Sequence, residues 1–281
     1  AGLLGDADLA MVNLETAVTN RGTAAPKAYA FRGPEEGLVA LRSAGVDVVS
    51  IANNHGMDFG RVGLADTLAS AGAAGLGLVG GGRNAAEAYR PHVAEIHGRR
   101  VAVLSATQVL DDIATTAWIA RPDRAGLASA KPEGNGLPRL LDAVRAAAST
   151  ADTVVVMLHW GREPQQCPAA DQRRLAAQVR AAGADVIVGG NAHRLAGGGY
   201  AGDTVVGYGL GNLVYPAGSG PATTSGVLTV TIAPDDRTSV AWRPAVLRDG
   251  VATAVEGADA QAATRAWKDL RECTDLRAGA A

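Results

Sequence analysis

Residues 50–60 read Ser50-Ile51-Ala52-Asn53-Asn54-His55-Gly56-Met57-Asp58-Phe59-Gly60. The preceding run, residues 46–51, is apolar, rich in β-branched side chains and short, which is typical of a buried parallel strand. Glycines at 56 and 60 allow tight turns, and apolar residues then recur at helical spacing until Gly72. The sequence therefore predicts a strand, a turn and a helix, with Asn54 and His55 at the strand's carboxyl end.

The polar turn has two interpretations. Open α/β sheets bind ligands at the carboxyl ends of their strands, and a neutral imidazole beside an amide oxygen and Asp58 can coordinate a metal or protonate a leaving group. A polar turn with a hydrogen-bonded histidine would look the same in sequence. The motif alone leaves both interpretations open.

The composition limits the class of protein. A chain of 281 residues with 47% hydrophobic residues can bury a large core, and we expect a single α/β domain over residues 1–281. A formal net charge of -2 gives no polybasic field, so we expect no nucleic acid partner. We expect no transmembrane segment, because no apolar run reaches the roughly 20 residues that a membrane helix needs. The two cysteines, Cys167 and Cys273, could form one disulfide.

The same arrangement recurs along the chain, because several predicted strands end in polar side chains. The residues at these ends are Asn13, Glu15, His159, Glu163, Asn191, His193 and Asn212. Asn13 and Glu15, two apart, should point to the same side of an extended backbone. Strands that each finish in His or Glu are hard to explain by packing alone, so we expect Glu15, His55, His159 and His193 to converge at one sheet edge.

Two other stretches do not show a predicted strand that ends in polar side chains. Residues 107–136 lack a clean period, and we expect a long excursion over the site. Residues 75–80 satisfy the G-x-G-x-x-G dinucleotide pattern, but they follow a predicted helix and look like a strand. A dinucleotide site needs the opposite order, so we interpret these glycines as structural.

Five motifs occur in a fixed order: Asn13-Leu14-Glu15, Asn53-Asn54-His55-x-x-Asp58-x-Gly60, His159-Trp160-Gly161-x-Glu163, Gly189 to His193, and Tyr208-Gly209-Leu210-Gly211-Asn212. Over about residues 6–245 this order resembles the CapA family of bacterial poly-γ-glutamate capsule synthesis proteins. The resemblance implies a metallophosphatase-like four-layer α/β/β/α sandwich, akin to the calcineurin-like metallophosphoesterases. It also implies a place in the cell envelope or outside the cell, with the cytoplasm left open.

The resemblance assigns roles to the strand-end residues. The implied ligands of a divalent metal, manganese, zinc or iron, are Glu15, Asn54, His159, Asn191 and His193. The implied catalytic residues are His55, His159 and Asp58. The implied substrate-binding residues are Asn13, Trp160, Arg162, Glu163, Arg194 and Asn212.

Two departures from the family pattern bear on the metal. The family begins with a strand ending in Gly-Asp, and the residues ahead of Asp8 are too few to hold one. The family's late turn reads Gly-His-His-Pro-His, where this chain has Gly189-Gly190-Asn191-Ala192-His193. The first departure removes an aspartate ligand. The second replaces an imidazole with an amide oxygen, which binds zinc less well. Both departures weaken the case for a second metal ion.

Three functional hypotheses follow. The first is a metal-dependent hydrolase of a small phosphoester or γ-glutamyl peptide, with His55 or His159 protonating the leaving group. The second is a non-catalytic component of capsule synthesis or export that binds an anionic polymer through Arg162 and Arg194. The third, a dinucleotide-binding enzyme, rests only on the rejected glycine pattern.

Overall fold

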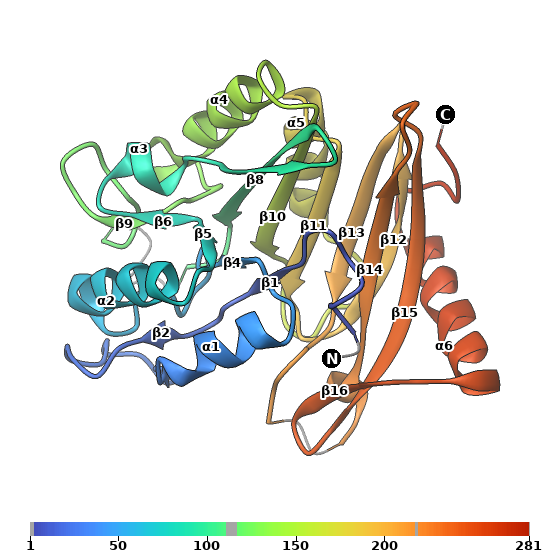
Figure 1. Ribbon diagram of the computed structural model, residues 1–281, viewed down its shortest axis with the longest axis horizontal. Helices are drawn as coiled ribbons and strands as arrows, with labels where there is room; N and C mark the ends of the chain where they lie inside the picture. Colours follow the sequence, from blue (N-terminus) through green and yellow to red (C-terminus); the bar gives the residue numbers. More distant parts are fainter. Residues whose placement is uncertain (1–2, 111–116, 217–218, 281) are drawn as a thin grey trace. The chain divides into compact units, whose positions relative to one another are not determined.

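The computed structural model describes residues 3–110, 117–216 and 219–280. Its contacts divide the chain into two compact units, with the boundary between His159 and Trp160, inside strand β10. Both units combine helices and strands, so the predicted α/β class is confirmed at that level (Figure 1). The expectation of one domain over residues 1–281 is not tested by this division and stays a prediction.

The first unit carries the motifs up to His159. Its elements are β1 (Met11–Asn13), β2 (Ala17–Val18), β3 (Arg32–Gly33), α1 (Glu36–Ser43), β4 (Val48–Ser50), α2 (Gly60–Ala73), β5 (Gly77–Val79), β6 (Gly81–Gly82), α3 (Ala85–Ala88), β7 (His92–Ile96), β8 (Arg99–Thr107), β9 (Gly126–Leu127), η1 (Glu133–Asn135), α4 (Gly136–Ala148) and β10 (Thr153–Trp160). The predicted strand, turn and helix around residues 46–72 are confirmed as β4 and α2. The glycine pattern at 75–80 falls on strand β5, as predicted.

One sheet of this unit has the order β1-β4-β5, all parallel. Asn13 lies opposite Ser50 in the register, so the residues that follow β1 and β4 leave the sheet at the same edge. Helices α1 and α2 cover one face, where Leu38 and Ala71 pack with Val49 in one buried cluster. Each fully buried aliphatic side chain here contributes about 1.5–3 kcal/mol of transfer free energy.

A second set of strands, β7-β8-β10, packs on the other face of that sheet. Val48 and Val79 from the first sheet pack with Val103 from β8, and the hydroxyls of Ser50 and Ser105 lie 2.5 Å apart. Strands β8 and β10 are parallel, which places His159 opposite Thr107. Helix α4 packs on β8. The polar ends of β1, β4 and β10 are thereby fixed by buried strands.

The second unit begins at Trp160. Its elements are α5 (Ala170–Ala181), β11 (Val186–Asn191), β12 (Leu195–Ala201), β13 (Thr204–Leu210), η2 (Pro221–Thr223), β14 (Thr224–Ile232), β15 (Thr238–Arg248), β16 (Val251–Ala254), α6 (Gly257–Asp269) and η3 (Leu270–Cys273). Strands run in the orders β12-β13-β11 and β14-β15-β16. Trp242 and Trp267 stack at 4.7 Å between ring centroids and join β15 to α6. A disulfide joins Cys167, ahead of α5, to Cys273 in η3.

We expected residues 107–136 to form a long excursion over the site. For the residues of this segment that the structure describes, this expectation is wrong, and residues 111–116 lie outside the described residues. Ile119 and Leu127 are fully buried in a cluster with Ile51, and β9 pairs with β6. This segment lacks a period because it alternates short bridges and turns, yet it contributes to the core. In the described ranges, every helix is too short or too polar to span a bilayer.

Candidate functional site

Three polar side chains from different elements of the first unit meet at the end of β10. Nε2 of His159 lies 3.0 Å from Oδ1 of Asn54 and 3.7 Å from Oε1 of Glu15. The His159 side chain is 3% exposed and that of Glu15 is 20% exposed. One nitrogen and two oxygens thus lie close together, with Glu15 providing the opening to solvent.

A chain of amides holds Glu15 in place. Nδ2 of Asn13 donates to Oε2 of Glu15 at 2.8 Å, and Nδ2 of Asn53 donates to Oδ1 of Asn13 at 2.9 Å. Asn53 is fully buried, and its Oδ1 accepts the backbone N–H of His55. Asn13, which was assigned to substrate, therefore orients a carboxylate here. Asn53 was missed, although its place inside the motif was the available signal.

His55 and Asp58 form a buried pair. Nδ1 of His55 lies 2.6 Å from Oδ2 of Asp58, and the same oxygen accepts the backbone N–H of Phe31 at 2.6 Å. The Phe31 ring stacks on the imidazole at 4.1 Å between centroids. Because the carboxylate occupies Nδ1, the imidazole has Nε2 left for proton transfer.

Sequence reasoning also missed Lys27, which joins this pair from a loop. Its Nζ lies 3.0 Å from Oδ1 of Asp58 and donates to the backbone carbonyl of Asn54 at 2.6 Å. The Lys27 side chain is 8% exposed, and Nζ lies 5.4 Å from the centre of the Trp118 ring. A buried ammonium group thus fixes both the carboxylate and the turn that carries Asn54 and His55.

In the second unit, His193 gathers the other polar strand ends. Its Nδ1 lies 2.7 Å from Oδ1 of Asn212, and its Nε2 lies 3.8 Å from Oε1 of Glu163. The ring of Tyr215 stacks on the imidazole at 4.6 Å. Asn212 in turn donates to the carbonyl of Ala222 at 2.9 Å. The structure thus brings three predicted residues of this unit together around one imidazole.

Asn191 keeps one oxygen without a partner. The residue is 7% exposed, and its Nδ2 donates to the carbonyl of Gly161 at 3.0 Å. Within the described part of the chain, its Oδ1 is buried and accepts no hydrogen bond. The backbone has φ 111°, a conformation that side-chain-bearing residues rarely adopt. This fixed, unsatisfied oxygen has a lone pair available to a cation.

The remaining predicted residues have other surroundings. Trp160 is 1% exposed, and its indole N–H donates to the carbonyl of Tyr208 at 2.9 Å, which is a core position. Gly189 lies against this indole, because a Cβ there would come within 1.9 Å of Nε1. The Arg162 side chain is 68% exposed, and its Nη2 lies 3.9 Å from Oδ2 of Asp171. Arg194 is half-buried.

The phenol of Tyr208, whose carbonyl accepts from Trp160, is also buried. Burial raises the pKa of Tyr208 above its ordinary value.

The donor chemistry limits which metal would fit. Among the described residues, no three His, Cys, Asp or Glu side chains gather closely enough to hold an ion. Glu15 and His159 would therefore need the amide oxygen of Asn54 as a third donor. A set with two oxygens and one imidazole suits manganese or iron better than it suits a structural zinc ion, since structural zinc prefers thiolates and imidazoles.

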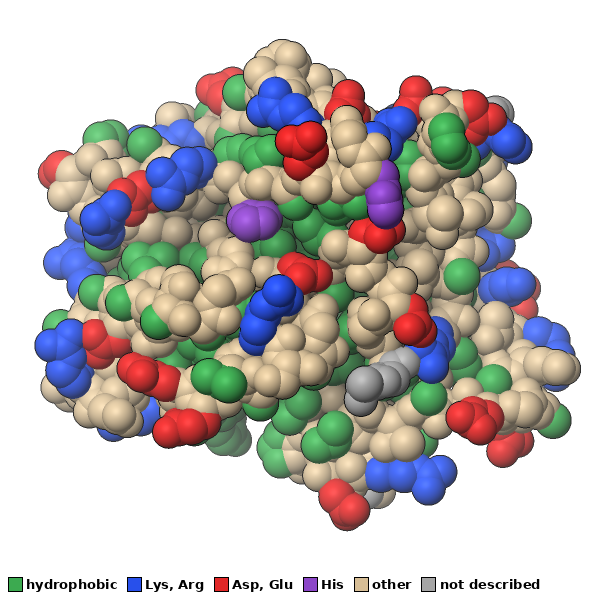
Figure 2. Space-filling view, in the orientation of Figure 1, with side chains coloured by type: hydrophobic (Ala, Val, Ile, Leu, Met, Phe, Trp, Pro, Cys, Tyr) green, Lys and Arg blue, Asp and Glu red, His purple; other side chains and the backbone are tan. Residues whose placement is uncertain are grey.

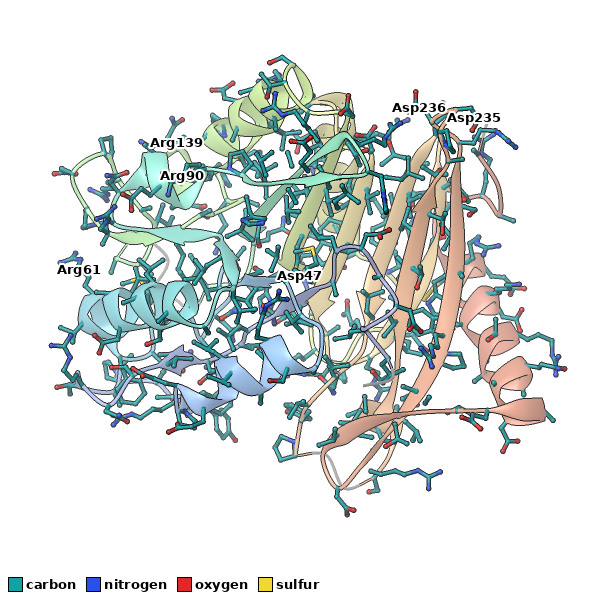
Figure 3. The ribbon with its side chains drawn as sticks, viewed as in Figure 1. Asp47, Arg61, Arg90, Arg139, Asp235 and Asp236 are labelled. Atoms are coloured by element: carbon teal, nitrogen blue, oxygen red, sulfur yellow. A yellow bond between two sulfur atoms is a disulfide. The ribbon has the colours of Figure 1, made fainter. Side chains whose placement is uncertain are left out.

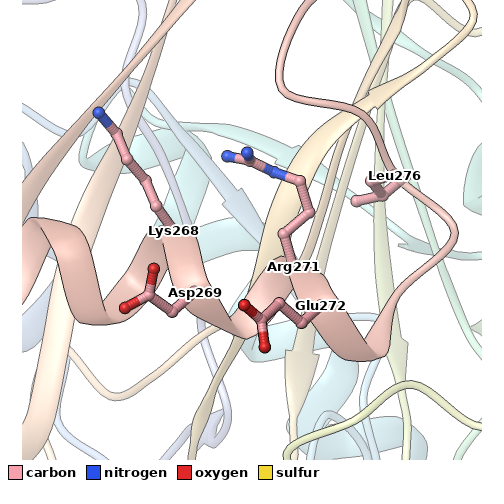
Figure 4. Close-up of a pocket in the computed structure, with 5 residues that line it drawn as sticks. All are labelled: Lys268, Asp269, Arg271, Glu272 and Leu276. Carbon is pink, nitrogen blue, oxygen red and sulfur yellow. The ribbon is translucent and has the colours of Figure 1, made fainter.

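A surface pocket of about 360 Å³ in the second unit lies elsewhere. It is lined by Lys268, Asp269, Arg271, Glu272 and Leu276, at the end of α6 and in the segment that follows (Figure 4). Its two cations and two carboxylates balance one another. None of the predicted site residues lines it.

Several known bacterial proteins are similar in sequence to this chain. The chain is 33% identical over 185 residues to the PGA biosynthesis protein CapA of Bacillus subtilis (strain 168), covering 66% of this chain and 46% of that protein. It is 34% identical over 184 residues to the capsule biosynthesis protein CapA of Bacillus anthracis, covering 66% of this chain and 44% of that protein. A probable polyglutamine synthesis accessory protein of Mycobacterium tuberculosis is 31% identical over 190 residues, covering 66% of this chain and 50% of that protein. The chain spans about half the length of these curated relatives.

Fold comparison gives a hypothetical protein from Thermus thermophilus, with a TM-score of 0.52 and 16% identity. The alignment covers 85% of this chain and 88% of that one, which shows a shared fold and nothing about activity. The model of the bacterial capsule synthesis protein family, PGA_cap, matches residues 1–217. The chain therefore belongs to the bacterial capsule synthesis protein family.

Proposed function

We propose that this protein acts in the metabolism of a capsule or envelope polymer as a metal-dependent hydrolase of a phosphoester or a γ-glutamyl amide. The observation that carries the proposal is the meeting of His159 with Asn54 and Glu15, next to the His55–Asp58 pair. The names of the relatives, which refer to capsule and PGA biosynthesis, support the polymer context.

The finer fold assignment belongs to the same proposal. A metallophosphatase-like α/β/β/α sandwich is supported in the first unit by α1 and α2 on one sheet, the packing of that sheet on β8, and α4 on β8. In folds of this kind, ligands bind at the carboxyl ends of strands. Glu15, Asn54 and His159 all follow or end such strands.

The residues of the first unit have two proposed roles, metal binding and proton donation. Glu15, Asn54 and His159 would hold the ion, which supplies hydroxide near neutral pH when bound. Nδ1 of His55 faces Asp58, so Nε2 is the ring nitrogen that would carry a proton to the leaving group. The stacked Phe31 ring keeps water from one face of this imidazole. His55 is therefore the proposed proton donor to the leaving group.

The test is turnover by the full chain supplied with manganese, zinc or iron. An aryl phosphoester and a γ-glutamyl peptide serve as substrates. His55→Ala and His159→Ala should each lower kcat by a factor of roughly 10² or more, the usual effect of losing a general acid or a ligand. His97→Ala, at an exposed histidine paired with Asp8, is the matched control. Turnover that survives in the double variant of His55 and His159 would sink the assignment.

The second candidate is a non-catalytic component that binds an anionic polymer. It is favoured by Arg162, whose side chain is 68% exposed and only loosely paired with Asp171 at 3.9 Å. In this case no metal should produce turnover. Arg162→Ala and Arg194→Ala should weaken retention on poly-γ-glutamate, and added salt should do the same.

A further inference from the structure

Phe31 presents an aromatic ring to solvent beside the proposed proton donor. The residue is 40% exposed, whereas His55, on which its ring stacks at 4.1 Å between centroids, is 6% exposed. The two rings are inclined by 26°. One part of the Phe31 ring therefore covers the imidazole, and another part faces outward.

Bonds between its loop and Asp58 fix the position of this ring. The backbone N–H of Phe31 donates to Oδ2 of Asp58 at 2.6 Å, and the backbone N–H of Ala25 donates to the carbonyl of Asp58 at 2.7 Å. Between these two residues in sequence, Nζ of Lys27 pairs with Oδ1 of Asp58 at 3.0 Å. Since Asp58 is fully buried, three contacts tie residues 25–31 to one fixed residue. The ring is thus preorganised for contact with a ligand.

The outward part of the Phe31 ring lies next to the place of a leaving group. Among the described residues, the polar contacts of the His55 imidazole are all made by Nδ1, with Asp58 at 2.6 Å and with Lys27 at 3.5 Å. Nε2 is left for a ligand, and an oxygen that takes a proton from it must lie about 2.6–3.2 Å away. Because the stacked rings are only 4.1 Å apart, atoms attached to that oxygen would lie against Phe31.

The charges on the outer surface of this unit do not favour one class of leaving group. On the face that Figure 2 draws, acidic and basic side chains of the described residues are mixed over the region of α1 and α2. The selection of a leaving group then depends on contact within the site, where Phe31 supplies an exposed apolar surface.

We propose that Phe31 is a specificity-determining residue, which selects substrates whose leaving group carries a flat aromatic ring. Aromatic rings attract one another in stacked and edge-to-face arrangements, beyond the effect of the area that they bury. Phe31 has one part of its ring engaged by His55 and another part available for such a contact. The inference rests on the proposed function, because it takes His55 as the proton donor, and it adds the class of leaving group.

A purely structural role for Phe31 makes a different prediction. If the ring only orients His55, its loss should affect every ligand of the site alike, whatever the leaving group. If the ring contacts the leaving group, its loss should affect only ligands that carry a ring. The two roles are therefore separated by a pair of ligands that differ in this one group.

The experiment compares phenylphosphonate with methylphosphonate, each titrated calorimetrically into the full chain supplied with manganese. The carbon–phosphorus bond of these probes replaces the ester bond, so the measurement gives binding without turnover. The parent should bind phenylphosphonate more tightly. Phe31→Leu keeps an apolar side chain on His55 and should weaken phenylphosphonate by about three- to tenfold, with methylphosphonate unchanged. Phe31→Tyr, which keeps a ring, should bind both as the parent does.

Tyr29→Leu is the matched control from the same loop. Tyr29 is 71% exposed, and in the described part of the chain its ring stacks on no other aromatic ring. This variant should keep the preference of the parent for phenylphosphonate.

Three results would each overturn the role of Phe31. They are equal binding of the two phosphonates by the parent, a Phe31→Leu variant that weakens both probes or neither, and an equal effect of Tyr29→Leu. A preference that depends on Phe31 in a chain without turnover would support this inference and contradict the hydrolase assignment alone.

Discussion

Replacing Lys27 with methionine removes a cation from a fully buried carboxylate. Nζ of Lys27 lies 3.0 Å from Oδ1 of Asp58, and the two side chains are 8% and 0% exposed. Breaking a buried ion pair from one side costs about 3–5 kcal/mol, because the remaining charge stays buried. Asp58 keeps the bonds of Oδ2 to His55 and to the N–H of Phe31, so we expect a loss of about 3 kcal/mol.

That loss corresponds to a fall in Tm of roughly 6–12 °C for a chain of this size. Urea unfolding followed by tryptophan fluorescence, together with calorimetry, would measure it. Lys268→Met, at an exposed lysine, is the matched control, and adding Asp58→Asn to Lys27→Met should recover part of the loss. If Lys27→Met unfolds within about 0.5 kcal/mol of the parent, the pairing described here does not contribute to stability.

Three further predictions concern other groups. The Cys167–Cys273 bond closes a loop with a sequence separation of 106, so reduction should destabilise the chain by up to about 4.8 kcal/mol in the chain-entropy model, measured by urea unfolding with and without reductant. Asn191→His should raise the affinity for zinc about tenfold in calorimetric titration, and an unchanged affinity would mean that the side chain of Asn191 faces away from any ion. Hydrogen bonds from Arg83 lower the pKa of Glu87 to about 2. This stabilisation is therefore present above the ordinary glutamate pKa and lost as pH falls through about 2, and Arg83→Gln should return the NMR titration of Glu87 toward its ordinary range.

Local pattern was sufficient for much of the fold. Strand β4 and helix α2 follow from an apolar run, glycines and helical spacing, all within thirty residues of sequence. The pairing of Asn13 with Glu15 follows from the two-residue repeat of a strand, and the structure confirms it at 2.8 Å. Such features depend on neighbours in the chain, which a sequence displays directly.

Lys27 could not be found in this way. It lies in an aperiodic loop, and it is buried only because Asn54 and Asp58, about thirty positions later, accept from it or pair with it. The family resemblance assigned Trp160, next to His159, to substrate binding. In a strand, however, neighbouring side chains point to opposite faces, so His159 meets Asn54 while Trp160 enters the core.

The disulfide has a consequence for how damage to this chain would be detected. The turn at Asp235 and Asp236 is exposed at the tip of the β14–β15 hairpin, and it lies between Cys167 and Cys273 in sequence (Figure 3). Exposed tips of this kind are preferred sites of proteolytic nicking. A single cut there would leave both fragments covalently joined, so nicked protein would run as one band in non-reducing electrophoresis and as two bands after reduction.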